Sequence, residues 1–180
     1  MQTTPAKLEV LYTPEQIAER IALMGEEISQ DYAGKTLMLV GVLRGAAILL
    51  ADLARAITLD CTYDFVAVSS YGKGHRSSGA VKLIKDLDHP IEHRHVLLVE
   101  DILDTGVTIS YLRNMLQQQQ PASLKIAALL DKPSRRLQKI EADYVGFCIP
   151  NRFVVGYGLD YAERYRNLPG ICLMPPDAPE

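Results

Sequence analysis

Hydrophobic positions along this 180-residue chain fall into two alternating patterns. Largely apolar stretches occupy residues 36–42, 95–99 and 123–130, and such stretches are typical of strands buried on both faces of a parallel sheet. Between them, apolar residues recur three or four positions apart, which predicts amphipathic helices. Strands that alternate with helices indicate an α/β fold with right-handed crossovers and a mostly parallel central sheet.

Three helices are predicted. The first begins at residues 13–16 (TPEQ), where a threonine cap, a proline at the first helical position and a glutamine three residues after the cap form a start signal. Gly34 is its expected end. The second helix follows a tight turn at residues 41–45, and the third begins near Val107.

The shorter elements have weaker signals. Residues 69–80 (SSYGKGHRSSGA) have no apolar periodicity, and we interpret them as a mobile loop. No repeat and no linker divides the sequence, and its length suits one well-buried domain covering residues 1–180. Further short strands are expected at residues 8–11, 60–69, 81–84, 144–149, 153–157 and 171–174.

Two adjacent acids, Glu100 and Asp101, stand where the strand at residues 95–99 is expected to end. Neighbouring carboxylates repel each other unless a cation or hydrogen-bond donors satisfy them. A sugar diol or a magnesium-bound ligand would do both. The pair therefore indicates a binding site.

Residues 104–108 (DTGVT) continue this chemistry. Gly106 permits close backbone approach, Thr105 and Thr108 offer hydroxyl groups, and a helix that starts near Val107 presents unpaired N–H groups and a partial positive charge. Together these features suit a phosphate monoester. The alternative interpretation is a helix cap, since Asp and Thr are common cap residues in enzymes and non-enzymes alike.

Four segments that follow predicted strands are expected to meet in space. They are residues 41–45, 69–80 and 100–108, together with Lys132. In an open parallel sheet, ligands bind beyond the carboxyl ends of the strands. The sequence therefore predicts one site at that edge of the sheet.

Composition narrows the classes of protein. A formal net charge of −3 gives no bulk attraction to nucleic acid or anionic membranes. Three cysteines without a C-x-x-C pair suit a reducing compartment and form no cluster with zinc-ligand spacing. We see no signal peptide, and the longest apolar run is too short to span a bilayer. A cytoplasmic protein without a nucleic-acid or membrane partner is expected.

The stretch from residue 96 to residue 110 closely resembles the phosphoribosyl-diphosphate signature of the type I phosphoribosyltransferases. That signature is an apolar strand, two acids, two apolar residues, then Asp-Thr-Gly and a threonine, and every element is present. The resemblance runs from about residue 8 to residue 174. It implies that family's fold, in which helices flank a mostly parallel sheet and a small hood subdomain forms from the N-terminal segment and residues 150–180.

Other segments resemble further parts of this family's site. Residues 42–45 (VLRG) resemble the diphosphate-binding loop, where a cis peptide commonly precedes the arginine or lysine. Residues 130–133 (LDKP) and 153–161 (FVVGYGLDY) resemble the base-binding and hood segments of the hypoxanthine (hypoxanthine-guanine) branch. The resemblance thus assigns diphosphate binding to Leu43, Arg44, Gly45 and Arg166, and assigns Ser70 and Tyr71 to a flexible loop over residues 70–80.

The resemblance also implies which residues hold the sugar and the metal. Glu100 and Asp101 would hold the ribose hydroxyls and a first Mg²⁺, and Asp160 a second. Val107 stands where many relatives carry a longer or polar side chain, but only its backbone N–H is needed. The phosphoribosyl and 5'-phosphate group is assigned to Glu100, Asp101, Asp104, Thr105, Gly106, Val107 and Thr108.

For the base, the resemblance implies a 6-oxopurine. Lys132 would donate to its exocyclic oxygen, Phe153 would stack on the ring, and Val154 would meet it through its backbone. Asp160 is assigned to this purine site as well as to the second Mg²⁺. Without the resemblance, Lys132 reads as a solvated charge and both apolar residues read as core. Asp104 is placed to accept the proton of purine N7 as general base, although an orienting role is the alternative.

The implied activity is Mg²⁺-dependent transfer of the 5-phosphoribosyl group from phosphoribosyl diphosphate to N9 of hypoxanthine and guanine, by a homodimer or homotetramer. Two alternatives stay open at this stage. An RNA-binding pyrimidine regulator of the same fold could use the basic residues 132–136. An aspartic protease is suggested by residues 104–106 (DTG), but it needs two such triplets from two all-β halves. Neither a dinucleotide fingerprint nor a P-loop motif occurs.

Overall fold

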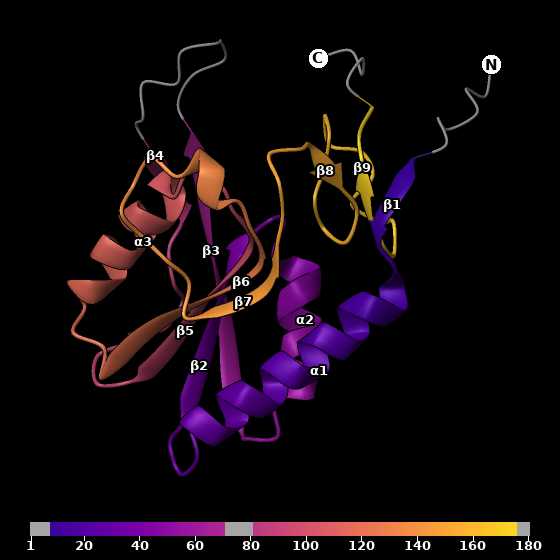
Figure 1. Cartoon of the computed structure of the whole chain (residues 1–180). Coiled ribbons are helices and arrows are strands. Elements are labelled where there is room, and N and C mark those ends of the chain that lie inside the picture. The colour runs from indigo at the N-terminus through magenta and orange to yellow at the C-terminus, as the bar shows by residue number, and fades with distance from the viewer. Residues whose placement is uncertain (1–7, 71–80, 176–180) are drawn as a thin grey trace.

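The computed structural model describes residues 8–70 and 81–175 (Figure 1). Its larger sheet has six strands in the order β4-β3-β2-β5-β6-β7. The five strands β3, β2, β5, β6 and β7 lie next to one another in that order and pair in parallel. The edge strand β4 pairs with β3 in the antiparallel direction. The strands are β2 (Leu37–Leu43), β3 (Cys61–Ser70), β4 (Val81–Lys85), β5 (His95–Leu103), β6 (Ser123–Asp131) and β7 (Tyr144–Cys148).

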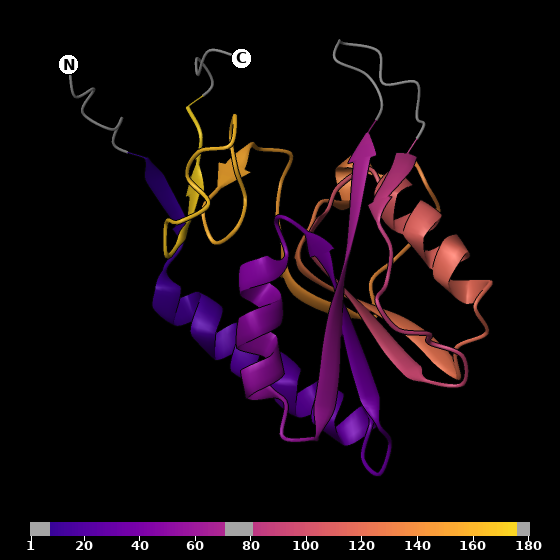
Figure 2. The ribbon, with the colours of Figure 1, turned by 180° about the vertical axis from the view of Figure 1, so that it is seen from behind.

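Helices cover both faces of this sheet (Figures 1 and 2). The pair α1 (Pro14–Asp31) and α2 (Ala47–Ala56) packs on one face, and α3 (Val107–Gln117) packs on the other. Each face has its own apolar core, because the central strands contribute side chains to both. The predicted α/β fold with a mostly parallel sheet is confirmed, which excludes the all-β halves of an aspartic protease.

A second, antiparallel sheet has the order β1-β9-β8. Its strands are β1 (Glu9–Tyr12), β8 (Val154–Val155) and β9 (Ile171–Leu173), so it joins the two ends of the described chain. Figure 1 places it beyond the upper ends of α1 and α2. Val154 and Ile171 belong to the same apolar cluster as Leu49 and Leu97, so this small sheet shares a core with the large one.

The start of α1 follows the predicted signal. Thr13 is the N-cap, and its hydroxyl accepts a hydrogen bond from the Gln16 backbone at 3.4 Å. The Gln16 side chain in turn accepts from the Thr13 N–H at 2.9 Å, which completes a capping box. The helix ends at Asp31, before the glycine expected to stop it.

Two strand predictions were wrong in extent. The strand expected to end at residue 99 continues to Leu103, because its ladder with β6 goes on through the pairs Glu100↔Ala128 and Leu103↔Asp131. The two acids therefore lie within β5 and not after it. The strand expected at residues 153–157 shrinks to the two residues of β8, because the backbone turns at Gly156, whose φ is 97°.

Candidate active site

The carboxyl ends of β5 and β6 and the segment around β8 enclose a cavity of about 490 Å³, here called the large cavity. Side chains of both charges and one aromatic ring line it, which suits a ligand with a flat polar ring. All of the residues that the resemblance assigns to the base lie here. Its lining residues are Asp101, Ile102, Asp104, Lys132, Arg135, Asn151, Arg152, Phe153, Val154, Leu159 and Asp160.

A smaller cavity of about 70 Å³, the phosphate cradle, lies at the start of α3. Gly106 is the N-cap of α3 with φ 80°, a conformation that favours glycine, and Val107 opens the helix. The N-cap itself has no side chain, and the only side-chain hydrogen bond to this helix start within the described residues is a long one, from the Val107 N–H to the Thr105 hydroxyl at 3.4 Å. The open helix start lines the cavity with Thr105 and Thr108, a geometry that favours an anion.

The two adjacent acids face different cavities. Successive side chains of a strand point to opposite faces of the sheet. Glu100 accordingly lines the phosphate cradle, and Asp101 lines the large cavity. The two cavities share Ile102 and Asp104, so they are neighbouring compartments of one site.

Glu100 is the least satisfied acid of the site. Its residue is 9% exposed, and its Oε2 has no hydrogen-bond partner within residues 8–70 and 81–175. Burial, together with the charge of Asp101, raises its pKa well above the usual range. A buried polar atom without a partner is costly, and a ligand hydroxyl or a cation would satisfy it.

Asp101 is held close to the backbone of a neighbouring loop. Burial raises the pKa of Asp101 to about 6, although its Oδ1 accepts a hydrogen bond from the Ile102 N–H at 2.8 Å. A Cβ at Gly45 would lie only 1.6 Å from Asp101 Oδ2. Position 45 therefore requires glycine if the carboxylate is to keep this place.

The loop between β2 and α2 matches the expectation for a diphosphate-binding loop. The peptide bond between Leu43 and Arg44 is cis. Arg44 Nη1 lies 2.5 Å from Glu163 Oε2, on the surface. Arg166 Nη2 lies 2.9 Å from Asp160 Oδ1 and 3.7 Å from Glu163 Oε1. Glu163 thus links the two arginines assigned to the diphosphate, a role that sequence reasoning missed.

Lys132 and Phe153, two residues assigned to the base, have exposed fractions opposite to those expected without the family resemblance. Lys132, which reads as a solvated charge without the resemblance, is 6% exposed, and burial lowers its pKa. Phe153, which reads as core, is 54% exposed and packs edge-on against Tyr161 with ring centroids 5.6 Å apart. Val154 alone behaves as core, at 4% exposed. A buried lysine and an open aromatic face on one cavity fit recognition of a flat oxygen-bearing ring.

Asp104 has a partner that sequence reasoning did not identify. Arg135 Nε donates to Asp104 Oδ1 at 3.0 Å. Arg136, the next residue, donates to the carbonyl of Leu103 at 2.8 Å and also to that of Asp104. The only sequence signal for this contact is the basic character of residues 132–136, which also suits the RNA contact of a pyrimidine regulator.

The predicted flexible loop lies almost entirely outside the residues that the structure describes. Tyr71 lies outside the described residues, and Ser70 is the last residue of β3, so the assignments to the flexible loop stay predictions. In the described part of the chain, no group of three or more His, Cys, Asp or Glu side chains is placed to hold a metal. Glu100, Asp101 and Asp160 therefore do not form a single metal cluster.

With this geometry established, the chain can be compared with known proteins. A model of the phosphoribosyl transferase domain matches residues 8–162. The chain belongs to this phosphoribosyltransferase family. The match spans both cavities and the diphosphate loop, so the sequence resemblance to this family is confirmed. Within the described residues, no helix is long and apolar enough to cross a bilayer.

Relatives in this family align over nearly the whole chain. The hypoxanthine-guanine phosphoribosyltransferase of Streptococcus mutans is 48% identical over 169 residues, which are 94% of each protein. The bifunctional protein TilS/HprT of Listeria monocytogenes is 49% identical, but the chain spans only 26% of that longer protein. A crystal structure of a hypoxanthine phosphoribosyltransferase from Staphylococcus aureus has a TM-score of 0.90 at 49% identity, covering 93% of this chain and 91% of that one.

Proposed function

We propose that this phosphoribosyltransferase acts in purine salvage. It transfers the 5-phosphoribosyl group from 5-phospho-α-D-ribose 1-diphosphate to N9 of hypoxanthine, and of guanine, giving IMP or GMP and diphosphate. The relatives of similar length carry the names of hypoxanthine and hypoxanthine-guanine phosphoribosyltransferases, which supports this branch of the family.

One observation carries the proposal. The phosphate cradle and the large cavity meet at Asp104 and Ile102. A ligand that fills both compartments has a phosphate at one end, a flat ring at the other and polar groups between them. A nucleoside monophosphate has this form. Glu100 and Asp101, one facing each compartment, then lie beside the ribose.

The reaction forms the N9–C1' bond and breaks the bond from C1' to the diphosphate oxygen. Lys132 donates to the exocyclic oxygen of the base and Phe153 stacks on its ring, which orients N9 toward the sugar. Asp104 accepts the proton that leaves the purine at N7. Arg44 and Arg166 face the departing diphosphate, where guanidinium groups stabilise the charge that develops.

The donor set also suits Mg²⁺ as cofactor. Mg²⁺ prefers hard oxygen ligands and is usually held by one or two carboxylates plus substrate phosphates, so a three-acid cluster is not needed. Glu100 and Asp101 would hold one ion and Asp160 a second, and the unpartnered Glu100 Oε2 supports a cationic or hydroxyl ligand there. When bound, Mg²⁺ neutralises charge on the diphosphate.

We further propose that residues 1–180 act as one phosphoribosyltransferase domain, with the small sheet as its hood and residues 70–80 as a flexible loop that includes Ser70 and Tyr71. The working form is a cytoplasmic homodimer or homotetramer. Its partners are small molecules, with no nucleic-acid or membrane partner, in keeping with the acidic net charge of −3.

The proposal is tested by a nucleotide-forming assay with phosphoribosyl diphosphate, Mg²⁺ and a panel of six bases. We expect product with hypoxanthine and guanine, and loss of product when the metal is chelated. The absence of product with every 6-oxopurine would overturn the proposal. Salt-sensitive RNA binding without purine turnover would instead favour the pyrimidine regulator.

A further inference from the structure

The segment after β6, residues 132–140, packs directly over the turn at residues 103–106. Three of its backbone N–H groups donate to the carbonyls of Leu103 and Thr105, at distances from 2.9 to 3.1 Å. A Cβ on Gly106 would lie 2.7 Å from Ile140 Cγ2, so the two pieces of chain are in close contact. Residues 132–140, which include Lys132 of the large cavity, therefore fix the position of the turn at residues 103–106, which lines the phosphate cradle.

Two consecutive arginines of this segment act on different parts of that turn. Arg136 donates to the carbonyls of Leu103 and Asp104 and also pairs with Asp131, so it fixes the backbone. Its side chain is only 15% exposed. Arg135 is different, because its side chain is 45% exposed, lines the large cavity and pairs with the Asp104 carboxylate.

We propose that Arg135 is a positioning residue for Asp104. Its Nε holds Oδ1 at 3.0 Å, and no hydrogen bond reaches Oδ2 from any residue in the described ranges 8–70 and 81–175. With one oxygen held, the rotation of the carboxylate is defined and Oδ2 is the oxygen left for the purine N7–H. The inference rests on the proposed function, in which Asp104 faces the base.

In the described part of the chain, Asp104 pairs with Arg135 and not with Lys132. Lys132 and Asp104 line the same cavity and carry opposite charges, yet they form no ion pair among the described residues. A guanidinium already seated on Asp104 weakens the pull of that carboxylate on Lys132. The ammonium of Lys132 therefore stays available for the exocyclic oxygen of the base.

The experiment compares Arg135→Ala, Arg135→Gln and Arg94→Ala. The Gln amide nitrogen occupies about the position of the arginine Nε and can still donate to Oδ1. Arg94 is a control, since its guanidinium bonds Thr62 near the amino ends of β3 and β5, at the opposite end of the sheet. Each variant is checked by circular dichroism and thermal unfolding before kinetics.

We expect Arg135→Ala to lower kcat/KM for hypoxanthine about 10-fold, the result of a misplaced catalytic group. The KM for phosphoribosyl diphosphate should change less than about twofold, because Arg135 lines the large cavity and is not among the residues that line the phosphate cradle. Arg135→Gln should recover most of the loss, and Arg94→Ala should match the wild type. Calorimetric titration with IMP, whose N7 carries no proton for Asp104 to accept, should show similar binding for all three variants and the wild type.

The double variant Arg135→Ala with Asp104→Asn separates positioning from direct substrate contact. If Arg135 acts through Asp104, its removal has no further effect in the Asp104→Asn background. A persistent effect there, an equal rise in the KM for phosphoribosyl diphosphate, or wild-type kinetics of Arg135→Ala would each overturn the inference. The proposed function fails differently, by absence of nucleotide product from the wild-type chain.

Discussion

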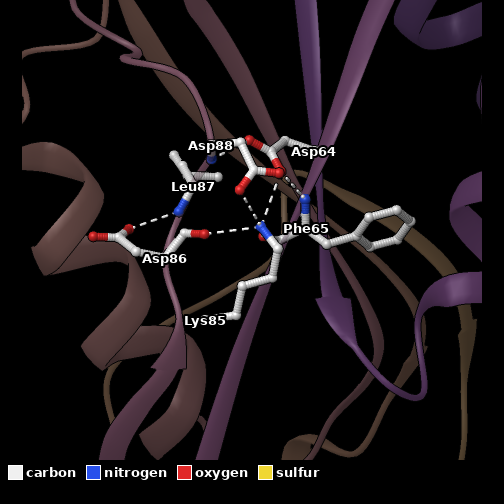
Figure 3. A network of polar contacts seen from close by, with 6 residues as sticks. All are labelled: Asp64, Phe65, Lys85, Asp86, Leu87 and Asp88. Atoms are coloured by element: carbon white, nitrogen blue, oxygen red, sulfur yellow. Dashed lines mark hydrogen bonds and ion pairs between the residues drawn. The ribbon is translucent and has the colours of Figure 1, made fainter.

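Two acids of this chain, Asp64 on β3 and Glu100 on β5, are nearly equally buried but differently satisfied. Asp64 is 6% exposed and Glu100 is 9% exposed. Asp64 accepts hydrogen bonds from the backbone N–H groups of Phe65 at 2.6 Å and Asp88 at 2.7 Å, and Lys85 Nζ lies 3.4 Å from its Oδ1 (Figure 3). Glu100 Oε2 has no partner within the described ranges.

The pKa values of the two acids move in opposite directions for this reason. Burial acts to raise the pKa of Asp64, but the donors from Phe65, Asp88 and Lys85 outweigh it, so the pKa is lowered. Burial and the neighbouring charge of Asp101 both raise the pKa of Glu100, and no donor within the described residues offsets them. A satisfied buried acid ties β3 to the chain after β4, whereas an unsatisfied one at a cavity marks a place for a ligand.

The substitution Glu100→Gln tests this comparison most directly, and its largest expected effect is a loss of activity. Replacing the carboxylate by an amide of the same shape removes the charge that, under the proposed function, orders the sugar and the metal. We expect kcat/KM for phosphoribosyl diphosphate to fall roughly 100- to 1,000-fold. The free energy of unfolding should stay the same or rise, because burial disfavours the native charge. Steady-state kinetics and urea unfolding measure both, and a variant that loses stability without losing activity would contradict us.

The matched change Asp64→Asn should have the opposite result. It places an amide NH₂ against backbone N–H donors and removes the partner of Lys85. We expect a loss of about 2 kcal/mol of unfolding free energy. At a temperature where the variant stays folded, kcat should stay within about threefold of the wild type, since Asp64 does not line either cavity of the site. A selective loss of catalysis with unchanged stability would refute the structural role.

The third prediction concerns pH and Asp101, whose pKa in the folded protein is about 6 against an ordinary value of 3.8. A raised folded pKa gives stability that is fully present below the unfolded pKa and is lost as pH rises through the folded pKa. Between about pH 4 and pH 7 the wild type should therefore lose roughly 2 kcal/mol relative to Asp101→Asn. Urea unfolding of both proteins across this range measures the difference, and parallel pH curves would contradict it.

Much of the fold could be predicted from the sequence because its signals are local. Helix α1 starts at the predicted threonine cap, and the apolar stretches became the central parallel strands. The lengths of β5 and β8 could not be predicted in the same way. β5 extends through two acids because a neighbouring strand continues beside it, and that pairing is tertiary information.

The same distinction between local and tertiary information applies to the candidate site. The acids and the helix start of residues 100–108 were identified because a strand followed by a helix start has a fixed geometry. That Glu100 and Asp101 face different cavities became visible only with the sheet in place. Arg135 and Glu163 were missed because single charged residues in turns carry no pattern. Their partners lie 31 and 119 positions away in sequence.

The smallest expected effect comes from Lys85→Met, which sharpens the comparison by removing one partner of Asp64 and sparing the others. The Lys85 side chain is 36% exposed, and its Nζ also bonds the Phe65 carbonyl and Asp88 Oδ1. Because the two backbone N–H donors to Asp64 remain, we expect a smaller loss of unfolding free energy than that of Asp64→Asn, part of it screened by salt. Urea unfolding at low and high ionic strength measures this.

A loss as large as that of Asp64→Asn would mean that the lysine, and not the backbone, satisfies the buried acid. The contrast with Glu100 would then rest on a missing cation instead of missing hydrogen bonds.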